Sequence, residues 1–243
     1  QTTVIYSLSL HDALPILRLN ADFSLTGVAS GLSKEHQMAW CQHGEKTYFS
    51  NGVQRGVIQE GIAQDWVVGE YFGSDTNRCF AVPEYITHLE IHSGRMYVSV
   101  GPVLYWSEQH RFDLFDMGGS EFHGAYIQFH HNINMIRSVA GGLFIGTEKQ
   151  TFFLVGNSPR DFVLQRVANS PPVEWSDART TIDGGEIGFD PGLCVLWASP
   201  VGAILGLPAG LIVNLTKEKI IYPKNVTQGF GCLVGYEFLH GMK

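Results

Sequence analysis

The chain has 243 residues, of which 44% are hydrophobic and 12% aromatic, with 28 glycines and a formal net charge of −7 at pH 7. This length suits one well-cored domain or two small ones, and the glycine and aromatic content favours short strands and tight turns. The acidic balance and the lack of a Lys/Arg cluster argue against non-specific nucleic-acid binding. No run of 18 apolar residues occurs, so no membrane-spanning helix is predicted.

Residues 1–16 are predicted to be a non-native leader. The string IYSLSLHDALPI over 5–16 closely resembles the conceptual translation of a widely used sequencing adapter, which has Thr in place of Ser7. A signal peptide is the alternative, but no basic residues precede the apolar ones and His11-Asp12 interrupts them. We therefore expect residues 1–16 to pack poorly, and residues 17–243 to form a single, N-terminally truncated domain.

The rest of the chain repeats one pattern, the β-meander. Ile86–Glu108 contains three strand-like runs separated by Ser93-Gly94 and Gly101-Pro102, both typical of turns. Similar meanders are predicted at 37–58, 134–155 and 192–215. The glycines that mark them recur at a period near 50 residues, which is typical of propeller blades of the kelch type: Gly44, Gly94, Gly142 and Gly202. The predicted fold class is all-β, a β-propeller-like array with about four blades, and an ordinary sandwich or irregular β domain is the alternative.

Three connections interrupt the repeats. Gln59–Glu84 is predicted to be a crossing segment with one or two short strands. Ser107–His131 is predicted to be the long connection between blades, with a short strand at Ala125–Phe129 near its end. Ala168–Pro191 carries Asn-Ser-Pro-Pro and Asp-Gly-Gly, which indicate a surface insertion.

Two clusters of polar residues were weighed as chemical sites. His88, Glu90 and His92 share one face of a strand, because alternate residues point the same way. A metal site is possible there, but the simpler interpretation is the solvated face of an amphipathic strand. Glu108, Asp113, Asp116 and Glu121 form the second cluster, and propeller hydrolases do use acid pairs. Here the acids alternate with aromatic residues, which favours packing and loop capping. We predict no catalytic residues, no cofactor and no metal.

The four cysteines are widely spaced and form no C-x-x-C pair. This spacing excludes a zinc knuckle or a thioredoxin-type motif. An even count permits two disulfides, but we favour free thiols that pack as small hydrophobic side chains. The residues are Cys41, Cys79, Cys194 and Cys232.

Three stretches resemble virion structural proteins of tailed bacteriophages, of the propeller-bearing tail, neck and packaged-DNA-stabilisation type. They are Gly94–Asp116, Gly142–Phe162 and Trp197–Thr216, and the most specific part is Gly146-Thr147-Glu148 followed by Thr151–Leu154. The resemblance implies a non-enzymatic tail or head–tail connector component, assembled into the virion in the bacterial cytoplasm. Implied partners are a portal, tail tube or fibre protein, and further copies in a homo-oligomeric ring. Specific nucleic-acid binding and membrane binding are not expected.

Partner contacts are expected on the connections 107–124 and 169–185, because loops on a rigid fold carry function. Aromatic residues in such loops are the usual interface anchors. The candidates are Phe112, Phe115, Phe122 and Trp175. The alternative function is a β-propeller hydrolase or a carbohydrate-binding module.

Overall fold

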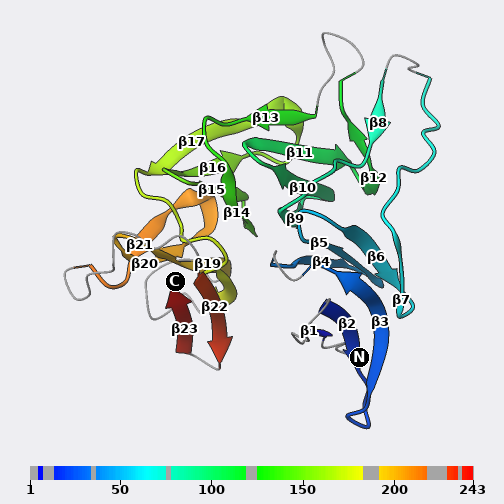
Figure 1. The fold of residues 1–243 in the computed structure, drawn as a ribbon. Coiled ribbons are helices and arrows are strands. Elements are labelled where there is room, and N and C mark those ends of the chain that lie inside the picture. Colours follow the sequence, from blue (N-terminus) through cyan, green and yellow to red (C-terminus); the bar gives the residue numbers. More distant parts are fainter. Residues whose placement is uncertain are drawn as a thin grey trace.

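A computed structural model describes residues 5–7, 14–33, 37–74, 78–118, 125–182, 192–217, 229–234 and 237–242. The protein is all-β, and its four larger antiparallel sheets are arranged as the blades of a β-propeller (Figure 1). Two smaller sheets lie at the two ends of the arc of blades. The predicted fold class is therefore confirmed. Within the described ranges, no helix has the length and apolar character needed to cross a membrane.

The N-terminal sheet packs on the first blade. It consists of β1 (Ile5–Ser7), β2 (Leu14–Leu19) and β3 (Leu25–Leu32). Ile16 is 1% exposed and lies in a cluster with Leu32, Phe49 and Ile58. The expectation that residues 1–16 pack poorly is therefore wrong at Ile16, whose burial the adapter-like sequence does not suggest. Residues 1–4 and 8–13 of this stretch lie outside the described residues.

The first two blades follow the predicted meanders. Blade 1 comprises β4 (Ala39–His43), β5 (Lys46–Ser50), β6 (Arg55–Gln59) and β7 (Ile62–Asp65). Blade 2 comprises β8 (Phe80–Ala81), β9 (His88–His92), β10 (Arg95–Val100), β11 (Val103–Glu108), β12 (Arg111–Asp116) and β13 (Tyr126–Gln128). The crossing segment thus holds two short strands, as predicted.

The connection predicted over Ser107–His131 is in part a strand. β12 pairs with the end of β11, and β13 pairs with the beginning of the same strand. The pairing of β11 with β12 is interrupted by a register shift between Ser107 and Glu108. This irregularity explains why the sequence pattern did not reveal β12.

Blades 3 and 4 complete the array. Blade 3 comprises β14 (Ile133–Val139), β15 (Gly142–Thr147), β16 (Thr151–Val155) and β17 (Val163–Ala168), with a 3-10 turn η1 (Pro159–Asp161) before β17. Blade 4 comprises β18 (Ala178–Ile182), β19 (Gly192–Ser199), β20 (Gly202–Gly206) and β21 (Ile212–Asn214), with η2 (Pro208–Gly210) before β21. The hairpin of β22 (Gly229–Val234) and β23 (Glu237–Met242) follows and packs on β18 and β19.

The four marker glycines lie at equivalent hairpins. Each lies in the hairpin between the first two strands of its predicted meander, namely β4–β5, β9–β10, β14–β15 and β19–β20. Gly44 and Gly94 are turn residues, whereas Gly142 and Gly202 are the first residues of β15 and β20. At the second of these turns both Ser93 and Gly94 have positive φ, 48° and 75°. A two-residue turn of this kind matches the twist of the strands that it joins.

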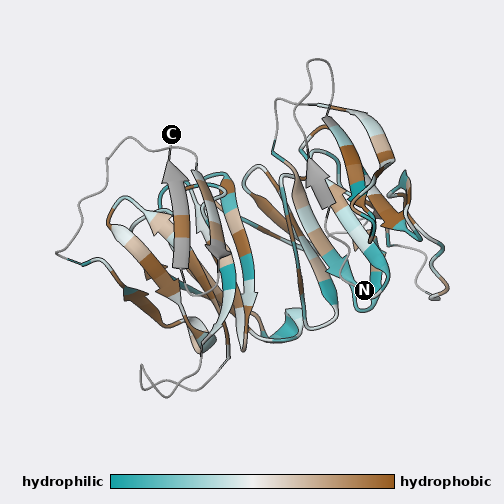
Figure 2. Cartoon of the chain, turned by 90° about the horizontal axis from the view of Figure 1, so that it is seen from below, coloured by the Kyte–Doolittle hydropathy of each residue, from teal (hydrophilic) through white to brown (hydrophobic). Residues whose placement is uncertain are grey.

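The hydrophobic core lies between neighbouring blades. One cluster joins blades 1 and 2, a second joins blades 2 and 3, and a third joins blades 3 and 4. Figure 2 shows the hydrophobic residues gathered along the strands. A single meander has two faces to cover, so radial stacking gives each face a neighbour. The strand β9 accordingly packs against both β4 and β14.

Candidate functional site

The strand β9 carries its polar residues into the interior. His88, Glu90 and His92 are 2%, 1% and 8% exposed. The prediction of a solvated face is therefore wrong. An amphipathic strand was inferred from the alternation, but β9 is the inner strand of its blade and has neighbours on both faces.

Glu90 is the centre of a buried ion cluster that joins three blades. Its carboxylate contacts the guanidinium of Arg179 directly, and its Oε2 lies 3.6 Å from Nη1 of Arg137. Arg137 in turn pairs directly with Asp177, which is 8% exposed. The backbone N–H of Ile91 donates to Glu90 Oε1 at 2.9 Å. Two acids and two bases cancel, as burial of charge requires.

The charges around Arg137 and Cys41 shift the pKa values of both groups. Burial lowers the pKa of Arg137, but the negative charges of Asp177 and Glu90 more than compensate, so the pKa is raised overall. Burial, with the charge of Glu90 adding to it, raises the pKa of the neighbouring Cys41 thiol to about 12. Cys41 is therefore a protonated, unreactive thiol at neutral pH, because the thiolate is the nucleophile.

Two members of the cluster, Glu90 and Arg137, occupy one repeat position. In the strand that precedes each marker hairpin, the residue two places before the last is Cys41 in β4, Glu90 in β9, Arg137 in β14 and Trp197 in β19. Aligning the meanders at their first hairpins places Glu90 beside Arg137. Sequence reasoning missed Arg137, Asp177 and Arg179, and this alignment is the signal that could have found the first of them.

His88 is enclosed by polar and aromatic neighbours. Its Nδ1 lies 3.2 Å from the hydroxyls of Thr87 and Ser99, and its ring stacks on Trp175 at 4.4 Å between centroids. Burial, together with the positive charge of Arg137, lowers the pKa of His88 to about 3. The imidazole is therefore neutral at pH 7, and its Nε2, 3.8 Å from Glu174 Oε1, makes no ion pair there.

The other histidine of β9 is also held by a hydroxyl. Nδ1 of His92 lies 2.8 Å from Oγ of Ser138 in the next blade. Burial lowers the pKa of His92, although Asn157 and Glu90 act in the opposite direction. Both histidines of β9 therefore contact hydroxyl groups rather than one another.

The candidate carboxylates are each paired with arginine. Oδ2 of Asp116 lies 2.8 Å from Nε of Arg78, which also contacts Glu108 directly. Asp113 pairs with Arg111 at 3.2 Å. Arg78 thus connects β11 and β12 to the segment before β8, whereas the Arg111–Asp113 pair lies within β12. The fourth candidate, Glu121, lies outside the described residues.

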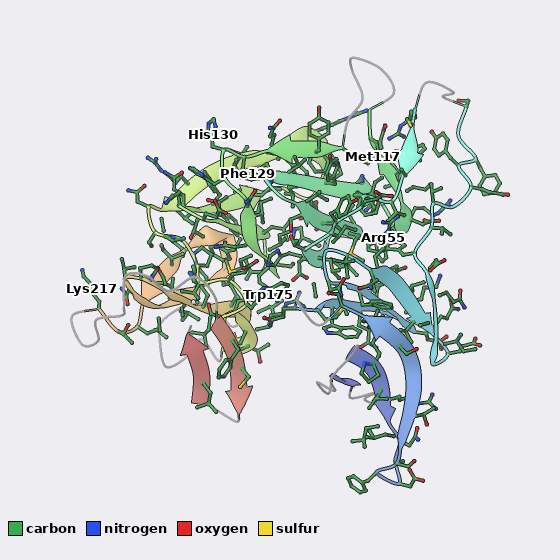
Figure 3. All side chains as sticks on the ribbon, viewed as in Figure 1. Arg55, Met117, Phe129, His130, Trp175 and Lys217 are labelled. Atoms are coloured by element: carbon green, nitrogen blue, oxygen red, sulfur yellow. The ribbon has the colours of Figure 1, made fainter. Side chains whose placement is uncertain are left out.

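The three predicted interface anchors that the structure describes are not exposed aromatic residues. Phe112 and Phe115 are 6% and 0% exposed and belong to the core between blades 1 and 2. They lie on β12, whose inward face the sequence pattern had not revealed. Trp175 is half-buried on the inner side of the arc, stacked on His88 (Figure 3). Phe122 lies outside the described residues.

Metal-ligating and thiol groups are dispersed. Across the residues described, no three or more His, Cys, Asp or Glu side chains are placed to hold a metal ion. In the described residues no disulfide joins the four cysteines, of which Cys41 and Cys194 are buried and Cys79 and Cys232 are exposed. The best-defined polar feature of the inner strands is therefore the cluster around Glu90. It is neutral overall and joins blades 2, 3 and 4.

Comparisons with known proteins identify the fold. No protein-family model and no curated protein matches the chain. The extracellular domain of BT4673 from B. thetaiotaomicron is similar with a TM-score of 0.53 at 12% identity, over 94% of this chain and 29% of that one. BBS1N in complex with ARL6DN gives a TM-score of 0.44 at 12% identity, over 96% and 84%. The chain thus spans less than a third of the BT4673 domain, and the likeness to that domain, at 12% identity, shows the fold alone.

Proposed function

We propose that the protein is a non-enzymatic structural component of a tailed-bacteriophage virion, of the tail or head–tail connector type. It acts in particle assembly as a rigid propeller that contacts a portal, tail tube or fibre protein. Copies of the chain associate in a ring. The protein is located in the virion, which is assembled in the cytoplasm of the bacterial host.

The observation that carries the proposal is that charged side chains inside the fold form ion pairs, several of which join neighbouring blades. Glu90, Arg137 and Asp177 join blades through buried ion pairs. Of the carboxylates considered for hydrolysis, the three in the described residues (Glu108, Asp113 and Asp116) are each paired with an arginine. Such contacts fix the blades relative to one another, which suits a scaffold. The phage-like strings in three separate meanders supply the virion assignment.

The proposal is tested in a phage that carries the gene. Purified particles should contain the protein in several copies when analysed by quantitative mass spectrometry, and deletion of the gene should give particles with an incomplete tail or connector. Particles that lack the protein yet assemble and infect normally would exclude the virion role. Hydrolysis of a glycan or ester by the purified protein, abolished by Asp113→Asn, would support the hydrolase alternative instead.

A further inference from the structure

An exposed apolar segment follows the last strand of blade 1. Between β7 and β8 the side chains of Val67, Val68 and Phe72 are 64%, 45% and 83% exposed. In the described part of the chain, no backbone–backbone hydrogen bond involves residues 66–73, and side chains bond only the carbonyls of Trp66 and Glu70 there. The segment therefore offers apolar side chains and peptide groups without a backbone partner together, a combination that suits pairing with another strand.

Side-chain contacts at both ends hold this segment in place. The indole N–H of Trp66 donates to the carbonyl of Phe112 at 3.0 Å. Arg111 Nη2 donates to the carbonyl of Glu70 at 2.7 Å, and the ring of Tyr71 lies 4.5 Å from that of Phe80. Because the segment is already ordered, a partner strand would not have to supply the free energy of ordering it.

The segment also forms one wall of a cleft. Val67, Val68 and Gly69 line a cleft of about 640 Å³. Its charged lining residues are Glu45, Asp65, Lys46 and the Arg111–Asp113 ion pair, so acids exceed bases. Asp65 and Glu70, at the two ends of the segment, are exposed. No ion pair of the described residues involves either of them. The segment is therefore an acidic, apolar edge.

An edge strand with exposed apolar and basic side chains lies on the opposite side of the arc. β17 is the outermost strand of blade 3 and pairs only with β16 among the described strands. Its Val163 and Leu164 are 53% and 39% exposed, and the exposed Arg166 follows them. Figure 1 places β17 and the segment after β7 on opposite sides of the arc. One copy of the chain can therefore present β17 while its own acidic edge remains available.

We propose that β17 of one copy pairs with residues 67–70 of the next copy, so that the chain associates head to tail. Arg166 then lies near the acidic edge, and the valines of the two strands cover one another. Because the two surfaces differ, the contact is heterologous and produces a ring or an open filament. A single strand pair buries less than the roughly 1,000 Å² of a stable interface, so each contact is weak until the ring closes.

This inference rests on the proposed ring and names its surfaces. The test uses the full chain in analytical ultracentrifugation over a range of concentrations. Val67→Asp and Val163→Asp each place a charge in one of the two surfaces, and Val201→Asp, at an equally exposed valine in the β19–β20 turn, is the matched control. Circular dichroism confirms that each variant is folded.

Wild type and Val201→Asp should self-associate as concentration rises, and less so in high salt because screening weakens the charged contacts. Each of the other two variants should remain monomeric alone. Mixed together, they should form dimers and nothing larger, because each retains the surface that the other has lost. A monomeric wild type at millimolar concentration, or unchanged association of either variant, would overturn the inference. Incorporation into particles is measured separately, so that failure here leaves the virion role to its own test.

Discussion

The side chain of Glu90 is 1% exposed and contacts Arg137 and Arg179. The cluster around it connects blades 2, 3 and 4. Replacing Glu90 by Gln removes the negative charge and leaves the arginines with Asp177 alone. Breaking a buried ion pair from one side costs about 3–5 kcal/mol, and the partial exposure of Arg179 reduces this. We expect Glu90→Gln to lower the free energy of unfolding by roughly 2–4 kcal/mol in urea denaturation. The exposed Glu148→Gln is the control, and a loss below about 1 kcal/mol for Glu90→Gln would show that the cluster does not join the blades.

His88 makes stability depend on pH. Its pKa is lowered to about 3 in the folded protein, chiefly by burial, against an ordinary value of 6.5. Between these values the unfolded chain binds a proton that the folded chain does not, so stability falls as pH falls from 6.5 toward 3.

From pH 7 to pH 5 this single group should cost about 2 kcal/mol. We expect the His88→Gln variant to lose that part of the pH dependence in urea titrations, while His130→Gln, at an exposed histidine, follows the wild type. Parallel slopes for His88→Gln and wild type would mean that His88 is protonated equally in both states.

At the scale of the element, the first hairpin of each blade depends on its turn. Gly94 has φ +75°, and a Cβ at this position would lie 2.6 Å from Cε1 of His110. Gly94→Val should therefore cost roughly 1–3 kcal/mol, through a backbone conformation that β-branched residues avoid and through displacement of the His110 ring. Gly27 has no positive φ and nothing within 4 Å of its would-be Cβ, so Gly27→Val is the matched control. Equal thermal stability of the two variants would contradict the assigned turn.

The sequence predicted correctly those elements that depend on residues adjacent in the chain. Tight turns such as Ser93-Gly94 and the strands on either side are local features, and all four hairpins lie where the marker glycines placed them. β12 was missed because its pairing with β11 crosses a register shift. The burial of His88 and Glu90 was missed because it depends on the strands of two other blades, which alternation within one strand cannot reveal.

The candidate site was predictable only in part for the same reason. The sequence pattern grouped His88, Glu90 and His92 on one face, and the structure does place them together on β9. Their partners Arg137 and Asp177 are far along the chain and become neighbours only when blades 2, 3 and 4 stack. The sequence pattern predicts a loop at Phe112 and Phe115 and therefore places them at the surface, whereas β12 packs both in the core between blades 1 and 2.

For the whole molecule, the question is whether the N-terminal sheet belongs to the same cooperative unit as the blades. Ile16 of β2 is 1% exposed against Phe49 and Ile58 of blade 1. Removing most of a buried isoleucine side chain costs about 2–5 kcal/mol. In a chain of this size each kcal/mol lowers the melting temperature by about 2–4 °C. Ile16→Ala should therefore lower the melting temperature of the single main transition by at least about 4 °C. The control Ile62→Ala, at an isoleucine that is 62% exposed in β7, should change the melting temperature little.

Both variants are measured by calorimetry together with a chain that lacks residues 1–16, which should be destabilised at least as much as Ile16→Ala. If the shortened chain melts like the full one, the N-terminal sheet is an independent appendage, and the cooperative unit begins at blade 1.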